Sequence, residues 1–313
     1  MSASVAARPT KQRAKQRLGD RLFAGSTRAA GLVILVALAG VAVFLTVQGL
    51  PAFSADKAAL FGKSSFAAFV LPLLFGTLLA AAIALLIATP LALGVALVIS
   101  HYAPRRLAKA VGYAVDLLAA VPSVVYGLWG IGFLGVKLVP VYAWLAAHAS
   151  FIPLFAGPAS ATGRTILTAA IVLAIMVLPI ITAITREIFA QTPTLHQEAA
   201  LALGATRWEM IRMAVFPYAK SGIVSAMMLG LGRALGETMA VAMVLSASGV
   251  VSFNLIGSQN PSTIAANIAL NFPEATGLRV NALIATGLVL FVVTFAVNFT
   301  ARAIVARGER GKK

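Results

Sequence analysis

Six long apolar segments constrain this chain more than any other feature of its sequence. A helix needs about 20 apolar residues to cross the hydrocarbon core of a bilayer, and each segment is at least that long. None of them alternates apolar and polar residues as a strand of a membrane barrel does. The sequence therefore predicts an all-α integral membrane protein with six transmembrane helices. The predicted spans are residues 30–50, 70–101, 111–146, 165–190, 218–247 and 279–303.

The composition excludes a water-soluble domain. Hydrophobic residues make up 60% of the 313 residues and charged residues only 11%, which leaves too little polar surface to cover a soluble fold. Pro90, Pro122 and Pro140 lie within the two longest segments, and we expect them to bend or break those helices. The chain has no cysteine, which excludes disulfides, thiolate metal sites and thiol nucleophiles.

The basic residues predict the orientation in the membrane. The net charge is +16, and most Lys and Arg lie before the first span, at 105–109, between Arg186 and Lys220, and from Arg302 onwards. By the positive-inside rule these alternate loops are cytoplasmic, and so are both termini. The basic N-terminal tail is then a topology signal that contacts anionic membrane lipid. The alternative is an arm that binds nucleic acid, and the distribution of charge over alternate loops argues against it.

A polar stretch between the fourth and fifth apolar segments has the pattern of short helices with a sharp break. Thr194–Gln197 reads T-x-x-Q and Thr206–Glu209 reads T-x-x-E, and both match a capping box at a helix start. Gly204 lies between them and suits the left-handed conformation that ends a helix. Pro217 can open a third helix without losing a needed donor. The sequence therefore predicts two short helices followed by a membrane span.

The first of these helices has a small, flat surface. Ala199, Ala200 and Ala202 leave a narrow face that suits the cleft of a partner protein. We place Glu198 and Glu209 in first helical turns, where a carboxylate favours the positive end of the helix dipole. An ordinary amphipathic surface loop is the alternative interpretation.

The register of this stretch resembles the EAA loop of binding-protein-dependent ABC importer permeases. That pattern is E-A-A, three residues, Gly, nine residues and then I-x-L-P, and Ala214 and Phe216 stand here where Ile and Leu are usual. The resemblance implies a cytoplasmic coupling loop, residues 194–217, that receives an ATPase subunit. The residues implied in coupling are Glu198, Ala199, Ala200, Gly204, Ala205, Trp208 and Pro217.

Other motifs in the chain do not indicate catalysis. The G-x-G-x-x-G at Gly130–Gly135 lies inside an apolar span, with no strand before it, and indicates helix packing rather than a nucleotide site. Lys57 occupies the position where a phosphate-binding loop ending at Gly62–Ser64 would need its first glycine. The three histidines are scattered over separate loops and support no metal centre. These are His101, His148 and His196.

Two ionisable residues fall within a predicted span. Arg233 and Glu237 are four residues apart, and we expect them on one face of the fifth helix. An isolated charge at that depth costs at least a few kcal/mol, so both side chains must face protein or water. One hypothesis is a structural ion pair. The other is a polar point on a solute path, since a guanidinium binds an oxyanion through two N–H groups and a nearby carboxylate keeps that binding weak.

Other polar and small residues in the spans leave similar alternatives. For the polar residues, helix-to-helix hydrogen bonding competes with solute contact. These residues are Thr77, Ser123, Tyr126 and Thr238. Gly232 and Gly236 form G-x-x-x-G, which predicts a close helix contact.

Three stretches together resemble the permease family of the high-affinity bacterial phosphate importer, in its C-type form. They are PSVVYGLWG from Pro122, the coupling loop with ALGATRWE, and RALGETMAV from Arg233. The resemblance covers residues 66–305. It implies the six-helix type I ABC importer permease (MetI-like) fold, with this chain forming half of a transmembrane pore in the bacterial inner (plasma) membrane. The implied substrate path contains Arg233, Glu237, Thr238, Ser123 and Tyr126.

The same resemblance implies the partners. A second, A-type permease would complete a heterodimer, two ATP-binding cassette ATPase subunits would dock on the coupling loop, and a periplasmic phosphate-binding protein would deliver phosphate to the outer loops at 146–164 and 250–278. ATP and magnesium would be bound by the ATPase. This chain would then bind no cofactor and be no enzyme.

The sequence also predicts how the chain is divided into parts, and it leaves two rival functions open. The first span is too long for a cleaved signal peptide and is expected to be a retained anchor. A permease for another oxyanion, such as sulfate or molybdate, would share the loop. A self-contained secondary anion transporter is less consistent with the capped helices and with the lack of a detectable internal repeat. The predicted parts are a cytoplasmic tail at 1–28, the first transmembrane helix at 29–50, the permease core at 66–305 and a second basic tail at 306–313.

Overall fold

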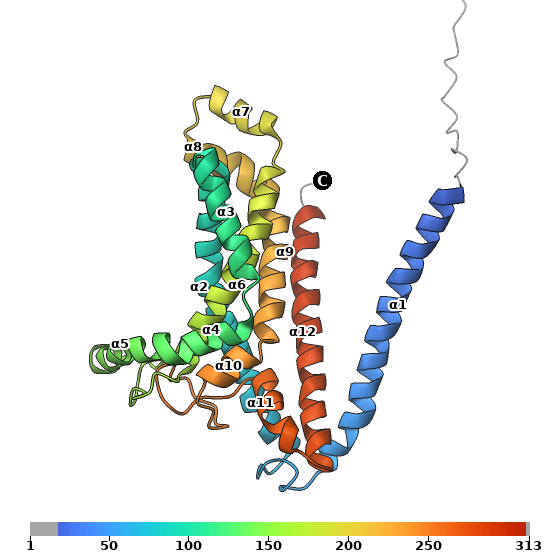
Figure 1. Ribbon diagram of the computed structural model, residues 1–313, viewed down its shortest axis with the longest axis vertical. Coiled ribbons are helices and arrows are strands. Elements are labelled where there is room, and N and C mark those ends of the chain that lie inside the picture. The colour runs from blue at the N-terminus through green and yellow to red at the C-terminus, as the bar shows by residue number, and fades with distance from the viewer. Residues whose placement is uncertain (1–17, 311–313) are drawn as a thin grey trace, which may run out of the picture. The chain divides into compact units, whose positions relative to one another are not determined.

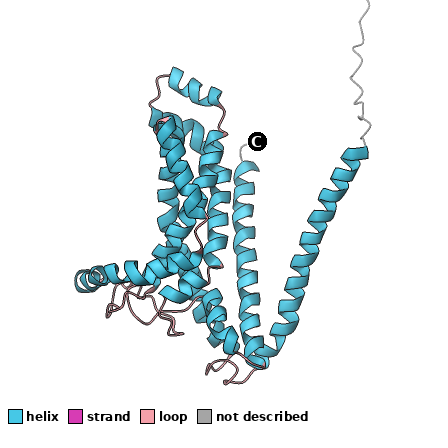
Figure 2. Ribbon diagram, in the orientation of Figure 1, coloured by secondary structure: helices cyan, strands magenta, loops and turns pink. Residues whose placement is uncertain are grey.

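The computed structural model describes residues 18–310, and this part of the chain is helical with loops and one isolated bridge between Ala247 and Asn260 (Figure 2). The chain divides into two compact units, Met1–Val47 and Gln48–Lys313. Residues 1–17 and 311–313, which include parts of both predicted tails, lie outside the described residues. The all-α prediction is confirmed for the described part.

In the first unit, the structure describes most of one apolar helix. This helix, α1, spans Leu18–Gly49, so it already covers part of the segment that the sequence assigned to the tail. Its apolar composition extends over Leu22–Ser54, the first of the candidate membrane spans.

The second unit contains the remaining helices (Figure 1). They are α2 (Phe66–Leu97), α3 (Arg105–Ala119), α4 (Ser123–Trp129), α5 (Gly135–His148), α6 (Ile166–Ala190), α7 (Thr194–Ala202), α8 (Arg207–Met210), α9 (Phe216–Leu235), α10 (Met239–Val244), α11 (Ile264–Asn271) and α12 (Leu278–Arg310). Short 3-10 or π turns occupy Leu50–Ser54, Val98–Tyr102, Gly130–Leu134, Ile211–Val215 and Phe272–Glu274.

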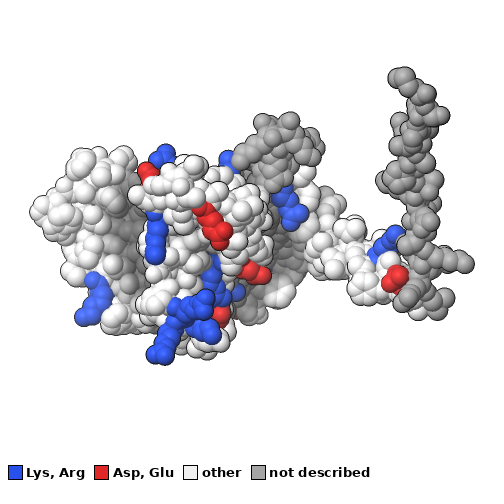
Figure 3. All heavy atoms as spheres, turned by 90° about the horizontal axis from the view of Figure 1, so that it is seen from above, with Lys and Arg blue, Asp and Glu red and all other residues white. Residues whose placement is uncertain are grey.

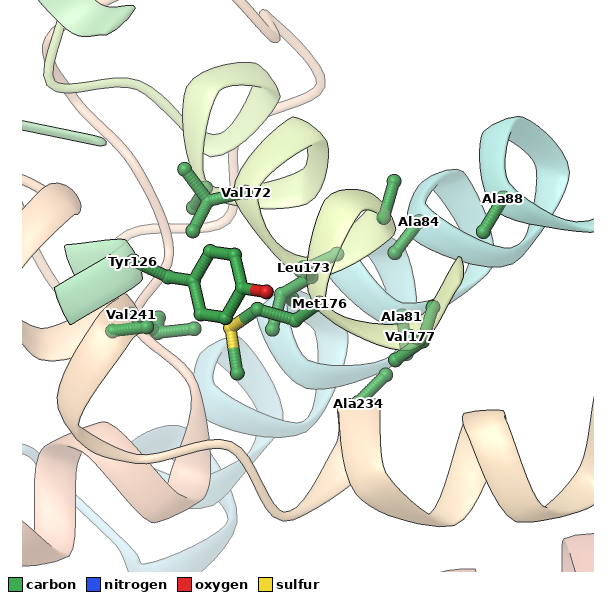
Figure 4. Packing of buried hydrophobic residues seen from close by; sticks show 14 of the residues in the cluster. Ala81, Ala84, Ala88, Tyr126, Val172, Leu173, Met176, Val177, Ala234 and Val241 are labelled. Atoms are coloured by element: carbon green, nitrogen blue, oxygen red, sulfur yellow. The ribbon is translucent and has the colours of Figure 1, made fainter. Parts of the chain in front are cut away.

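Helix α6 is the centre of this bundle and packs against α2, α3 and α9. Small residues on α2 allow the close approach, because they bring the two backbones together. Figure 4 shows Ala84 and Ala88 of α2 beside the α6 side chains that pack there. On α9, a Cβ added at Gly222 or Gly230 would lie within 3 Å of an isoleucine of α6. The buried alanines of α2 are Ala80, Ala81, Ala84, Ala88, Ala92 and Ala96.

Six helical segments of the described residues are long and apolar enough to cross a membrane, which agrees with the predicted number. The third prediction, 111–146, has the wrong start, because Pro122 separates α3 from α4. Helix α3 is amphipathic and runs alongside α6, whereas α4 and α5 run across the bundle at its far end (Figure 1). The third candidate span is Ser123–His148, and α3 is a separate helix packed against α6.

The fifth predicted span, 218–247, is wrong at its end. Helix α9 stops at Leu235, and α10 forms a separate short helix. At the start of this span, α8 continues through a π turn into α9, so that one helical run covers Arg207–Leu235.

The predicted cytoplasmic loops gather at one end of the bundle. Helix α7, the start of α3 and the end of α12 lie there, and α5, α10 and α11 lie toward the opposite end (Figure 1). Figure 3 views the molecule from the α7 end and shows several Lys and Arg side chains on it, with fewer acidic ones.

Candidate functional site

The break after α7 is built as the sequence predicts. Gly204 has φ +85°, the left-handed region that glycine adopts at little cost. Its N–H donates to the carbonyl of Leu201 at 3.0 Å, and the Ala205 N–H donates to the carbonyl of Ala200 at 3.2 Å. These two bonds form a Schellman motif, which ends the helix and turns the chain sharply.

The start of α8 is a complete capping box. The Glu209 N–H donates to Thr206 Oγ1 at 3.3 Å, and Glu209 Oε2 accepts from the Thr206 N–H at 2.8 Å. Trp208 projects from this turn with 54% of its surface exposed, and its ring meets Phe216 edge to face at 6.4 Å. The prediction of a capped helix at Thr206 is confirmed.

Two predictions about the rest of the loop are wrong, and one is confirmed. The N-cap of α7 is Pro193, so Thr194 is already helical, and Gln197 Nε2 donates to the carbonyl of Thr192 at 3.1 Å instead of closing a box. Glu198 consequently lies beyond the first turn of α7. Pro217 stands in the first turn of α9, as predicted, and a π turn joins this helix to α8. A π turn before a proline relieves the missing N–H and the ring clash.

The coupling loop is anchored on one side and exposed on the other. Ala200 packs against a buried cluster that includes Phe189 and Ile211. Glu198 and Ala199 are exposed. Large apolar side chains are exposed as well, with Leu195 at 71%, Leu203 at 90% and Trp208 at 54%. Exposed apolar patches of this kind mark interaction surfaces.

The predicted ion pair between Arg233 and Glu237 is not formed in the part of the chain that the structure describes. Because α9 ends at Leu235, the two residues do not share a helix face. Glu237 is 8% exposed, and its Oε1 accepts from the Ala240 N–H at 3.1 Å. The carboxylate thus caps the start of α10, where the positive end of the helix favours a negative charge.

Arg233 faces a cavity instead. The cavity has a volume of about 650 Å³ and lies among α6, α9 and α12. Arg233 Nε is buried and has no hydrogen-bond partner among the described residues. Gly232 lines the same cavity, and a Cβ there would meet nothing within 4 Å. The close helix contact predicted at Gly232 and Gly236 is therefore wrong within this chain.

The other predicted path residues make mostly structural bonds. Tyr126 is 7% exposed, its hydroxyl donates to the Leu118 carbonyl at 2.8 Å, and its ring lies beside Leu173, Met176 and Val241 (Figure 4). Thr238 Oγ1 donates to the Gly236 carbonyl at 3.0 Å.

The buried Thr77 links two elements. Its hydroxyl donates to Leu73 and accepts from the Ile264 N–H at 2.9 Å, which ties α2 to α11. Ser123 is half-buried at the start of α4. Among the predicted path residues, Tyr126 interacts electrostatically with Arg233. Its helix, α4, packs against α10.

Sequence reasoning missed a polar hub at the opposite end of the bundle from α7. Asn260 is fully buried, accepts from the Ile166 N–H at 3.0 Å and donates to the carbonyls of Arg164, Ser246 and Gly257 at 3.1–3.2 Å. Arg164 Nη2 in turn lies 3.4 Å from two carbonyls at the end of α10. No local signal in the sequence identifies this asparagine, since its partners lie up to 96 residues away.

The chain is similar to known membrane transport proteins. A family model described as "Binding-protein-dependent transport system inner membrane component" matches residues 88–310. The chain is 46% identical over 307 residues to "Phosphate transport system permease protein PstC 2" of Mycobacterium tuberculosis, with 94% of each chain covered. It is 39% identical over 301 residues to "Phosphate transport system permease protein PstC" of Mesorhizobium japonicum, covering 93% of this chain and 91% of that one.

A solved structure shares the fold. The structure described as "Inward facing conformations of the MetNI methionine ABC transporter" matches with a TM-score of 0.55 at 16% identity, and the match covers 76% of this chain and 95% of that chain. At this identity the likeness concerns the fold alone, which is the MetI type expected from the sequence.

Proposed function

Because the chain belongs to the family of binding-protein-dependent transport system inner membrane components, we propose that it is the permease subunit of an ATP-driven importer of inorganic phosphate. The observation that carries this proposal is the pair of relatives named as phosphate permeases, at 46% and 39% identity over more than nine tenths of the chain.

In this proposal the coupling loop receives the ATPase. The exposed side of the loop, with Glu198, Ala199, Leu203 and Trp208, would enter a cleft of that partner. Its buried side packs through Ala200 on the cluster formed by α2, α6 and α9. Helix α8 continues into α9 without a break. A movement of the loop would therefore be transmitted to the membrane spans. ATP and Mg²⁺ would be bound and hydrolysed in the partner subunit, whereas this chain supplies the moving helices.

Helix α9 would form one wall of the phosphate path. Arg233 faces a cavity and has an Nε without a partner in the described chain, so its N–H groups are available to an oxyanion. Glu237 lies four residues further along the chain and carries the opposite charge, which would keep phosphate binding weak enough for release. The A-type permease would supply the facing wall.

The orientation follows from the ends of the bundle. The end with α7 would be cytoplasmic, together with both termini, because basic loops face the cytoplasm. The loops at 146–164 and 250–278, on the opposite side, would then dock the periplasmic phosphate-binding protein.

Uptake of radiolabelled phosphate tests this function. Vesicles that contain the whole complex should take up phosphate only with ATP and the binding protein, and substitution Arg233→Gln should lower uptake with assembly unchanged. Arg106→Gln, a change at an exposed arginine of α3, is the matched control. Sulfate or molybdate uptake in place of phosphate, or uptake driven by an ion gradient in this chain alone, would overturn the proposal.

A further inference from the structure

The cavity beside Arg233 contains a second arginine. Arg302 of α12 lines it, as do Asn298 on the same helix and Ser225 on α9. The lining extends along α9 from Val224 to Arg233, which corresponds to about 13 Å of helix. Helix α9 runs away from the α7 end of the bundle and α12 runs toward it (Figure 1), so Arg302, near the end of α12, lies nearer to the α7 end than Arg233, near the end of α9.

The charges of this cavity are all of one sign. Among the described residues that line it, two are arginines and none is acidic. Glu237, the nearest acidic residue along the chain, is turned into the cap of α10 and does not line the cavity. Within the described residues, the ion pair of the bundle is formed elsewhere, by Arg186 and Asp116 at 3.4 Å.

Arg233 is half-buried and Arg302 is exposed, and no ion pair is formed by either among the described residues. A charge within a membrane span needs an opposite charge or water. An anion that enters would meet a guanidinium at each end of the cavity. Asn298 Nδ2 donates to the Thr294 carbonyl at 2.9 Å, which leaves its second N–H for a ligand. Ser225 of α9 lines the cavity across from α12, and its hydroxyl donates to the Ser221 carbonyl at 3.0 Å.

We propose that Arg302, with Asn298, forms an inner binding site for phosphate, through which the anion passes after it leaves Arg233. This inference rests on the proposed function and extends it, because it assigns a role in the path to α12. A basic residue near the end of a span also serves as a topology signal, and the experiment must separate that role from phosphate binding.

The absence of cysteine from the chain allows a direct test in the assembled complex. Ser225→Cys places a single thiol in the cavity. In inside-out vesicles, an anionic methanethiosulfonate should modify this thiol roughly tenfold faster than its cationic counterpart, because the arginines attract anions. Inorganic phosphate should slow the modification, and potassium chloride at equal ionic strength should not.

In the Ser225→Cys background, Arg302→Gln should remove most of the phosphate protection of the introduced thiol, which lies on the facing helix, and should lower phosphate uptake. Arg106→Gln removes a positive charge from the same end of the bundle without touching the cavity, and it should change neither result. Arg302→Lys keeps the charge for topology and assembly but loses the two-point geometry for an oxyanion. It should keep the preference for the anionic reagent and lose part of the protection.

Equal rates with both reagents, or phosphate protection that survives Arg302→Gln, would overturn the inner site. Uptake by the unmodified complex is measured in parallel. If phosphate is transported but gives no protection, only the inner site is wrong. If phosphate protects but is not transported, the proposed function is wrong.

Discussion

Thr206 and Glu209 bond each other at both ends, with the Thr206 N–H donating to Glu209 Oε2 at 2.8 Å and the Glu209 N–H donating to Thr206 Oγ1 at 3.3 Å. This reciprocal pair fixes the corner between α7 and α8. Since α8 continues into α9, the corner determines how a force on α7 reaches the membrane span. The predictions for the coupling loop follow from this rigidity.

Thr206→Ala should loosen the corner by about 1 kcal/mol, because it removes the side chain that accepts from the Glu209 N–H. We expect assembled complexes whose ATP hydrolysis continues while phosphate uptake per ATP falls. The ratio of uptake to hydrolysis in vesicles measures this. Thr206→Ser retains the hydroxyl and should behave as the unmodified protein does, and an equal loss in both variants would contradict the argument.

Gly204→Ala should weaken coupling through backbone strain alone. At φ +85° a Cβ is unfavourable by roughly 1–2 kcal/mol, although no atom within 4 Å would clash with it. Gly204→Asn should be milder, since asparagine tolerates the left-handed region. Uptake by the two variants, at equal amounts of assembled complex, should rank asparagine above alanine. The reverse order would indicate that a partner needs the space at this position.

Local signals predicted the corner at Gly204 and Thr206 better than the start of α7 or the ends of the spans. Gly204 and Thr206 act on bonds within six residues, so their chemistry can be read from the sequence. Helix α3 was divided between a loop at 105–109 and a span that began at 111, whereas it is one helix that ends before Pro122. Its Asp116 is paired with Arg186 of α6, 70 residues away. Hydropathy cannot register such a partner.

The predicted path depended on the role of Gly236. The sequence assigned it to a packing motif with Gly232, whereas in the structure it follows the last residue of α9. A glycine near a helix end serves either role, and tertiary contacts decide between them. Because α9 ends before Gly236, Glu237 caps α10 and does not share a helix face with Arg233. The cavity at Arg233 could therefore not be predicted without knowing where α9 ends.

Glu237→Gln should separate the structural role of this side chain from its charge. The amide oxygen can still accept from the Ala240 N–H, so we expect normal assembly. Phosphate uptake should nevertheless fall, because an anion held by Arg233 would no longer be repelled by the carboxylate that caps α10, and its release would slow. Glu237→Ala loses the cap as well and should reduce the amount of complex. Normal uptake by the glutamine variant would show that the carboxylate serves only as a cap.

Asn260→Asp should destabilise the end of the bundle opposite α7. The substitution keeps an acceptor for the Ile166 N–H but removes the donor to the carbonyls of Arg164, Ser246 and Gly257, and it buries a carboxylate beside them. Buried acceptors without partners cost roughly 1–3 kcal/mol each, so the expected loss is about 3 kcal/mol or more. The apparent Tm of the purified complex measures it. Asn271→Ala, which removes one part-buried bond within the same stretch, should shift the Tm far less, and equal shifts would mean that Asn260 is not a hub.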